Sequence, residues 1–96
     1  MIKIRVKDLQ PLHAPDVSGE RKALQKLSDT TLLEAVIHPI NGDFLKMNPD
    51  TGKLVDGNGR AYELLRRASD SQSFITADTE IPVELYIRDN SGFLEL

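Results

Sequence analysis

The sequence contains no cysteine and no apolar run long enough to cross a membrane. Without thiols the chain has no disulfide, no thiolate metal site and no cysteine nucleophile. It also lacks the basic-then-apolar N-terminal pattern of a secretory signal. We therefore expect a soluble, cytoplasmic protein that has no membrane partner.

Basic residues are scattered, and the net charge is −3 at pH 7. The main basic positions are Arg21, Lys22, Lys46, Lys53, Arg60, Arg66 and Arg67. Because they do not form one run, nucleic acid is not expected as a partner of this chain alone. The histidines His13 and His38 stand apart from each other and from any ligand-spaced carboxylates, so no metal site is predicted.

The chain of 96 residues is expected to form one domain, residues 1–96. Alternating apolar residues and turn dipeptides predict its strands. The expected strands are residues 2–6, 43–47, 53–56, 81–87 and 93–96. The turn from Asn48 to Gly52 would join the second and third strands as a hairpin. Pro82 would place the start of the fourth strand at a sheet edge.

Three helices are expected between these strands. The first would begin at Ser18 as its N-cap and end near Ser28. The second would begin at Thr31, which has a glutamate at capping-box spacing, and would end before Pro39. The third would begin near Arg60, and residues 69–79 would form a loop. These elements predict an α+β (mixed α/β) fold, a small mixed sheet with two to three packed helices.

The stretch from Lys53 to Ala68 carries the candidate site, because a strand there runs through two glycines directly into a helix. The expected inward stripe of that helix is Ala61, Leu64, Leu65 and Ala68. N–H groups at a helix start, glycines that admit a ligand and the planar donor fork of Arg60 form a plausible phosphate or carboxylate cradle. The same dipeptides are also common in purely structural turns.

The run from Leu54 to Arg60 resembles the signature of the ParB/sulfiredoxin-like superfamily, in which a strand enters an Asp-Gly turn and then a helix. Residues 2–11 resemble the opening strand of that family, and His38-Pro39-Ile40 resembles its Pro-Ile step. Residues 80–84 resemble its Ile-Pro-Val strand. The resemblance covers residues 1 to about 88, like a ParB N-terminal domain without the DNA-binding helix-turn-helix. Gly59 departs from the pattern, where the family often has histidine or arginine.

The resemblance implies a site that holds nucleotide phosphates. Matched position by position, its phosphate- or nucleotide-binding residues are Asp56, Gly57, Asn58, Gly59 and Arg60. Asp56 would accept backbone N–H groups or help place a cation, and Arg60 would pair with a phosphate oxygen. Glu20, Arg21 and His38 are candidate supporting residues, although a packed structural role is favoured for His38. The implied cofactor is a nucleotide with Mg²⁺, and the identity of the nucleotide is left open.

Whether the chain is an enzyme is also left open. Some members of the superfamily are kinases or nucleases, but the sulfiredoxin reaction needs a cysteine, and Gly59 argues against hydrolysis. The alternative is a non-enzymatic protein-interaction module, in which the turn is structural and the loop at 69–79 contacts a protein partner. A small nuclease or toxin domain is least favoured, because the sequence shows no cluster of histidine and carboxylate residues.

Overall fold

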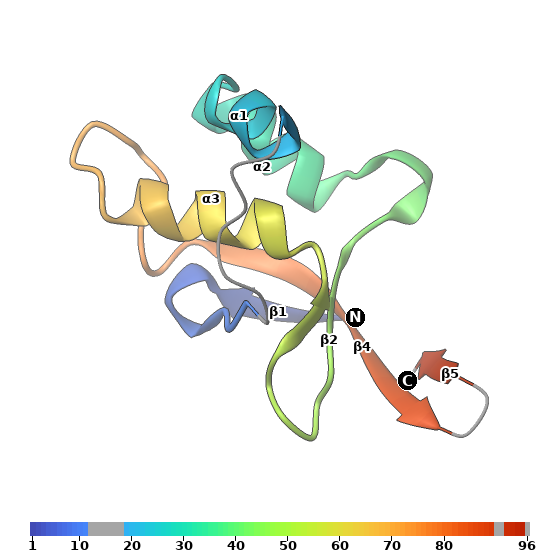
Figure 1. Cartoon of the computed structure of the whole chain (residues 1–96). Coiled ribbons are helices and arrows are strands. Elements are labelled where there is room, and N and C mark those ends of the chain that lie inside the picture. The colour runs from blue at the N-terminus through green and yellow to red at the C-terminus, as the bar shows by residue number, and fades with distance from the viewer. Residues whose placement is uncertain (12–18, 90–91, 96) are drawn as a thin grey trace.

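The computed structural model describes residues 1–11, 19–89 and 92–95, and it confirms the predicted α+β fold. The elements in chain order are β1 (Ile2–Arg5), the 3-10 turn η1 (Val6–Asp8), α1 (Gly19–Gln25), α2 (Asp29–Ile37), the 3-10 turn η2 (Ile40–Gly42), β2 (Leu45–Met47), β3 (Leu54–Asp56), α3 (Asn58–Ala68), β4 (Glu80–Asp89) and β5 (Gly92–Glu95). The three helices lie on one side of the sheet, so the core is the space between them and the strands (Figure 1).

The sheet has the strand order β1-β4-β2-β3, and β5 pairs with the far end of β4. Strand β4 runs antiparallel to β1 and parallel to β2, so the sheet is mixed. The start of β4 lies at a sheet edge, as Pro82 predicts, because residues 80–82 pair with β1 alone, although β4 further along has neighbours on both sides. Pro82 pairs with Lys3 of β1, and pairing with β2 begins one residue later, at Val83. The proline therefore precedes the parallel ladder, where its missing N–H group is tolerated.

The core draws its apolar side chains from both layers. Its buried members are Val6, Leu9, Leu32, Val36, Leu45, Leu54, Ala61, Leu64, Ile75, Ile81 and Val83. Leu64 and Val83 are fully buried, as their periodicity predicts, whereas Leu65 and Leu85 are only half-buried. The segment 69–79 forms neither helix nor strand, as expected, but Ile75 reaches back from it into the core.

The N-cap of α2 is Ser28, not Thr31 as expected. The backbone N–H of Thr31 donates to Ser28 Oγ at 3.1 Å, so Thr31 occupies the third helical position. Ser28 itself has extended backbone angles, and its hydroxyl oxygen accepts from an N–H group in the first turn, which is the defining geometry of an N-cap. As a result α1 ends at Gln25, earlier than predicted. The predicted N-cap of α1, Ser18, lies outside the described residues.

Replacing Ser28 with alanine should lower the free energy of unfolding by about 1 kcal/mol, because the Thr31 N–H would lose its acceptor. Thr31→Ala leaves that hydrogen bond in place, so it should cost clearly less. Urea denaturation followed by circular dichroism would measure both changes. A larger loss for Thr31→Ala than for Ser28→Ala would contradict this assignment of the cap.

Candidate functional site

The predicted strand-turn-helix is present at the end of the β2–β3 hairpin. Strand β3 ends at Asp56, and α3 begins at Asn58, within two residues of the expected start at Arg60. The hairpin is closed by the Asn48 N–H, which donates to the Lys53 carbonyl at 3.0 Å. Register pairs Lys46 of β2 with Asp56. The turn therefore follows a strand that is held in place by its neighbour.

Gly57 forms the turn itself, and the backbone there requires glycine. Its φ of 85° lies in the left-handed region, which side chains other than glycine rarely adopt. A Cβ atom at this position would also overlap the Leu45 Cδ2 methyl group, which belongs to the core. The Gly57 carbonyl accepts the Ala61 N–H at 3.0 Å, as the first hydrogen bond of α3. The close approach of this glycine to Leu45 thus sets where the helix starts.

The start of α3 carries no side-chain cap and no acidic residue in its first turn. It opens on a hollow of about 370 Å³, which we call the turn hollow. The lining residues are Asp43, Val55, Asp56, Gly57, Asn58, Gly59 and Arg60. The structure thus brings all five residues that the sequence nominated for phosphate binding to the wall of one hollow. It adds Asp43 to them from another part of the chain.

Arg60 is held firmly by contacts with the rest of the domain. Its Nη1 donates to the backbone carbonyls of Asp43 at 2.8 Å and Ala35 at 3.2 Å, and its Nη2 lies 3.7 Å from Asp43 Oδ2. The side chain is only 14% exposed. The acidic residues nearest to Arg60 in the sequence are Asp56 and Glu63. The partner is instead Asp43, because the turn η2 carries the chain back across the start of α3.

A lysine that the sequence did not nominate completes the charges around the turn. Lys46 Nζ donates to Asp43 Oδ1 at 3.2 Å, to the Phe44 carbonyl at 3.1 Å and to Asp56 Oδ2 at 3.4 Å. The hydrogen bond from Lys46 is the main cause that lowers the pKa of Asp43. The other oxygen of Asp56 accepts the Gly57 N–H at 2.9 Å, which is the turn-holding role predicted for it. The sequence offered one signal for Lys46, which is that it lies opposite Asp56 in the predicted hairpin.

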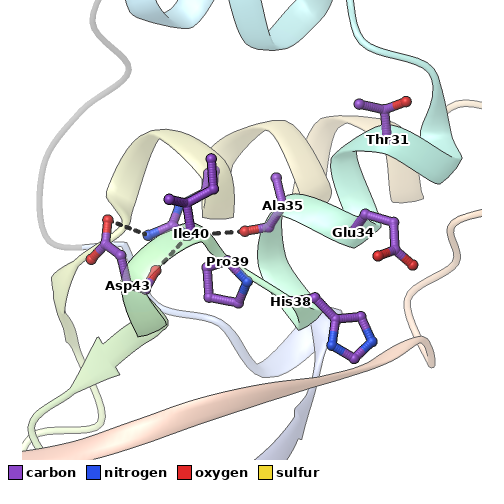
Figure 2. Close-up of a pocket in the computed structure, with 8 residues that line it drawn as sticks. Thr31, Glu34, Ala35, His38, Pro39, Ile40 and Asp43 are labelled. Atoms are coloured by element: carbon purple, nitrogen blue, oxygen red, sulfur yellow. Dashed lines mark hydrogen bonds and ion pairs between the residues drawn. The ribbon is translucent and has the colours of Figure 1, made fainter.

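Of the three supporting candidates, only His38 has a described side chain, and it does not line the turn hollow. The side chains of Glu20 and Arg21 lie outside the described residues, as does His13. His38 is exposed, so the favoured packed role is wrong. It lines a second hollow of about 440 Å³, the α2 hollow, at the end away from Asp43 (Figure 2). The residues around the α2 hollow are Thr31, Glu34, Ala35, His38, Pro39, Ile40, Asp43 and Arg60.

A second charged cluster lies on the other end of α3 and is buried. Glu63 is fully buried and Arg67 is 5% exposed. Arg67 Nε donates to Glu63 Oε2 and its Nη1 to Asp29 Oδ1, both at 2.8 Å. Burial alone would raise the pKa of Glu63, but hydrogen bonds from Arg66 and Arg67 hold it below its ordinary value. This cluster joins α3 to the start of α2 and is structural.

Comparisons with protein-family models, curated proteins and solved structures found no match. The resemblance to the ParB/sulfiredoxin-like superfamily therefore stays a prediction. Across residues 1–11, 19–89 and 92–95, no group of three or more metal-binding side chains is placed to hold a metal ion. No helix in the described part of the chain is both long and apolar enough to cross a membrane.

Proposed function

We propose that this domain binds a phosphate group, carried by a nucleotide or a similar small ligand, at the turn from Asp56 to Arg60. The observation that carries the proposal is the uncapped start of α3, which opens on the turn hollow. Backbone N–H groups and the positive end of a helix dipole favour an anion there. The resemblance of this turn to a nucleotide-binding signature supports the same assignment.

The charges around the turn define how such a ligand would be held. Arg60 is fixed by two backbone carbonyls, so it offers a positioned positive charge and not a freely moving fork. Lys46 adds a second cation on the neighbouring strand. A Mg²⁺ ion brought by a nucleotide would meet the carboxylate of Asp56, an oxygen ligand of the kind it prefers. We propose binding alone, and no reaction.

The alternative function, a protein-interaction module with a purely structural turn, would be favoured if the turn packed against neighbouring chain. The residues from Val55 to Arg60 instead line an open hollow. Gly57 is the one turn residue that packs closely on the core, against Leu45. This arrangement supports ligand binding over the structural alternative.

Inorganic phosphate and nucleoside mono-, di- and triphosphates, with and without Mg²⁺, should raise the melting temperature if the proposal holds. A ligand at 100 times its dissociation constant adds about 2.7 kcal/mol to the free energy of unfolding. Asn58→Asp places an isosteric negative charge in the first turn of α3. It should leave stability unchanged or raise it by up to about 1 kcal/mol, yet weaken phosphate binding at least about tenfold by repulsion.

Asn48→Asp is the matched control, because it makes the same change in the hairpin turn. It should leave phosphate binding nearly unchanged. Arg60→Ala is a poor test by itself, since it also removes the contacts to Ala35 and Asp43. Phosphate stabilisation that is equal in the wild type and in Asn58→Asp would place the binding site elsewhere. No stabilisation by any of these compounds would overturn the proposal.

A further inference from the structure

The carboxylate of Asp43 lies between the two cations of the proposed site. Its Oδ1 accepts from Lys46 Nζ at 3.2 Å, and its Oδ2 lies 3.7 Å from Arg60 Nη2. The side chains of Lys46 and Arg60 are 19% and 14% exposed, whereas that of Asp43 is 61% exposed. The two cations are therefore recessed, and a solvent-facing anion already occupies the space between them.

The backbone of Asp43 is fixed, but its side chain is not enclosed. The Asp43 carbonyl accepts from Arg60 Nη1 at 2.8 Å, and its N–H donates to the Ile40 carbonyl at 3.2 Å. Two successive left-handed residues, Asn41 and Gly42, lead into it and set its position. Asp43 lines the α2 hollow (Figure 2) and also the turn hollow. Rotation about its side-chain bonds would move the carboxylate away without any change in the main chain.

We propose that Asp43 is a built-in competitor for the phosphate site. In the free protein its carboxylate occupies the position between Arg60 and Lys46 that an anionic ligand group takes, and it swings out when that ligand binds. This inference rests on the proposed function, because it requires an anion to bind at the turn. Carboxylate and phosphate oxygens accept from the same donors, and two anions held side by side repel each other. To displace Asp43, a ligand must therefore bind the two cations more strongly than a single carboxylate does. This disfavours acetate and chloride as ligands.

The test compares the dissociation constant of inorganic phosphate for the wild type, Asp43→Asn and Asp56→Asn by calorimetric titration. Asp43→Asn keeps the shape but removes the competing charge, so phosphate should bind about tenfold more tightly. Asp56→Asn is the matched control. It also removes an acid from the wall of the turn hollow and a partner of Lys46, but Asp56 has no contact with Arg60 among the described ion pairs. Its gain should be no more than about threefold.

A second readout follows the competitor directly. In wild-type protein labelled with ¹³C, the carboxyl resonance of Asp43 should move toward that of a solvent-exposed aspartate as phosphate saturates the site. The resonance of Asp78, an exposed aspartate on the loop before β4, provides the reference and should not move. This measurement decides the question even if a variant is too unstable to titrate.

Three outcomes separate this inference from the function on which it rests. Equal phosphate affinity in all three proteins, with an unmoved Asp43 resonance, would overturn the competitor and leave phosphate binding in place. An equal gain for Asp43→Asn and Asp56→Asn, again with an unmoved resonance, would reduce the effect to general charge and overturn the competitor as well. Absence of phosphate binding in every protein, Asp43→Asn included, would overturn the proposed function itself.

Discussion

Replacing Arg67 with alanine should lower the free energy of unfolding by about 3–5 kcal/mol, because buried Glu63 would lose one of its two arginine partners and three other buried or part-buried acceptors would lose their donor. Arg67 is 5% exposed and donates to the carboxylates of Glu63 and Asp29. It also donates to the backbone carbonyls of Leu24 at 3.0 Å and Leu27 at 2.6 Å. A loss of this size approaches the whole stability of a small domain, about 5–15 kcal/mol. Urea denaturation followed by circular dichroism would measure it.

Arg66→Ala is the matched control for this prediction. Arg66 pairs with the same carboxylate, Glu63, but its side chain is 45% exposed. Only the arginine of this pair is exposed, and Glu63 would keep Arg67, so the loss should be smaller, about 1–2 kcal/mol. Similar losses for the two variants would show that burial does not decide the contribution of these arginines.

Replacing Gly57 with alanine should lower the free energy of unfolding by about 3 kcal/mol, the sum of left-handed backbone strain and overpacking. The backbone φ of 85° disfavours any side chain, and the new methyl group would overlap Leu45 Cδ2. Because Leu45 is fully buried, it has little freedom to move aside. Chemical denaturation of the purified variant would give the size of the loss.

Gly59→Ala is the control in the same turn and should act in the opposite direction. Gly59 lies inside α3, and an added Cβ would be 3.6 Å from Leu24 Cδ1, an ordinary contact. Alanine should therefore stabilise the helix by up to about 1 kcal/mol. Equal losses at Gly57 and Gly59 would contradict the distinct roles of the two glycines.

The parts of the fold that depend on residues close together in the sequence were predictable. Alternation gave the strands near residues 2–6 and 81–87, and turn chemistry gave the hairpin and the start of α3. The sheet order was not predictable, because nothing local indicates that β4 inserts between β1 and β2. Pro82 indicated only that the start of β4 pairs on one side, and it gave no sign that the rest of the strand is central.

The buried face of α3 was predicted only in part. Ala61 and Leu64 are buried as expected, but Glu63 and Arg67 are buried as well, while Leu65 is half-buried. A prediction from the apolar pattern places charged side chains in solvent. Here Glu63 and Arg67 lie one helical turn apart and form an ion pair, which allows both to be buried. Their spacing of four residues was the available signal, although the same spacing is common on exposed helix surfaces.

The candidate site divides in the same way. Its residues from Asp56 to Arg60 are contiguous, so they could be nominated together from the sequence. Asp43 could not, because its approach to Arg60 depends on the path of the chain through η2. Tertiary contacts of this kind leave no periodic pattern in the sequence. Charged residues are also so frequent that the presence of two opposite charges is weak evidence for an ion pair between them.

The central position of β4 also affects how this chain folds during its synthesis. The hairpin β2–β3 and helix α3 can form as soon as they leave the ribosome, because their contacts are local. Strand β1 emerges first, yet its only neighbour in the described sheet is β4, which is made after residue 79. Such distant pairings form slowly. Until then β1 and β2 present unpaired edges, so the nascent chain is most exposed to aggregation between the synthesis of α3 and that of β4.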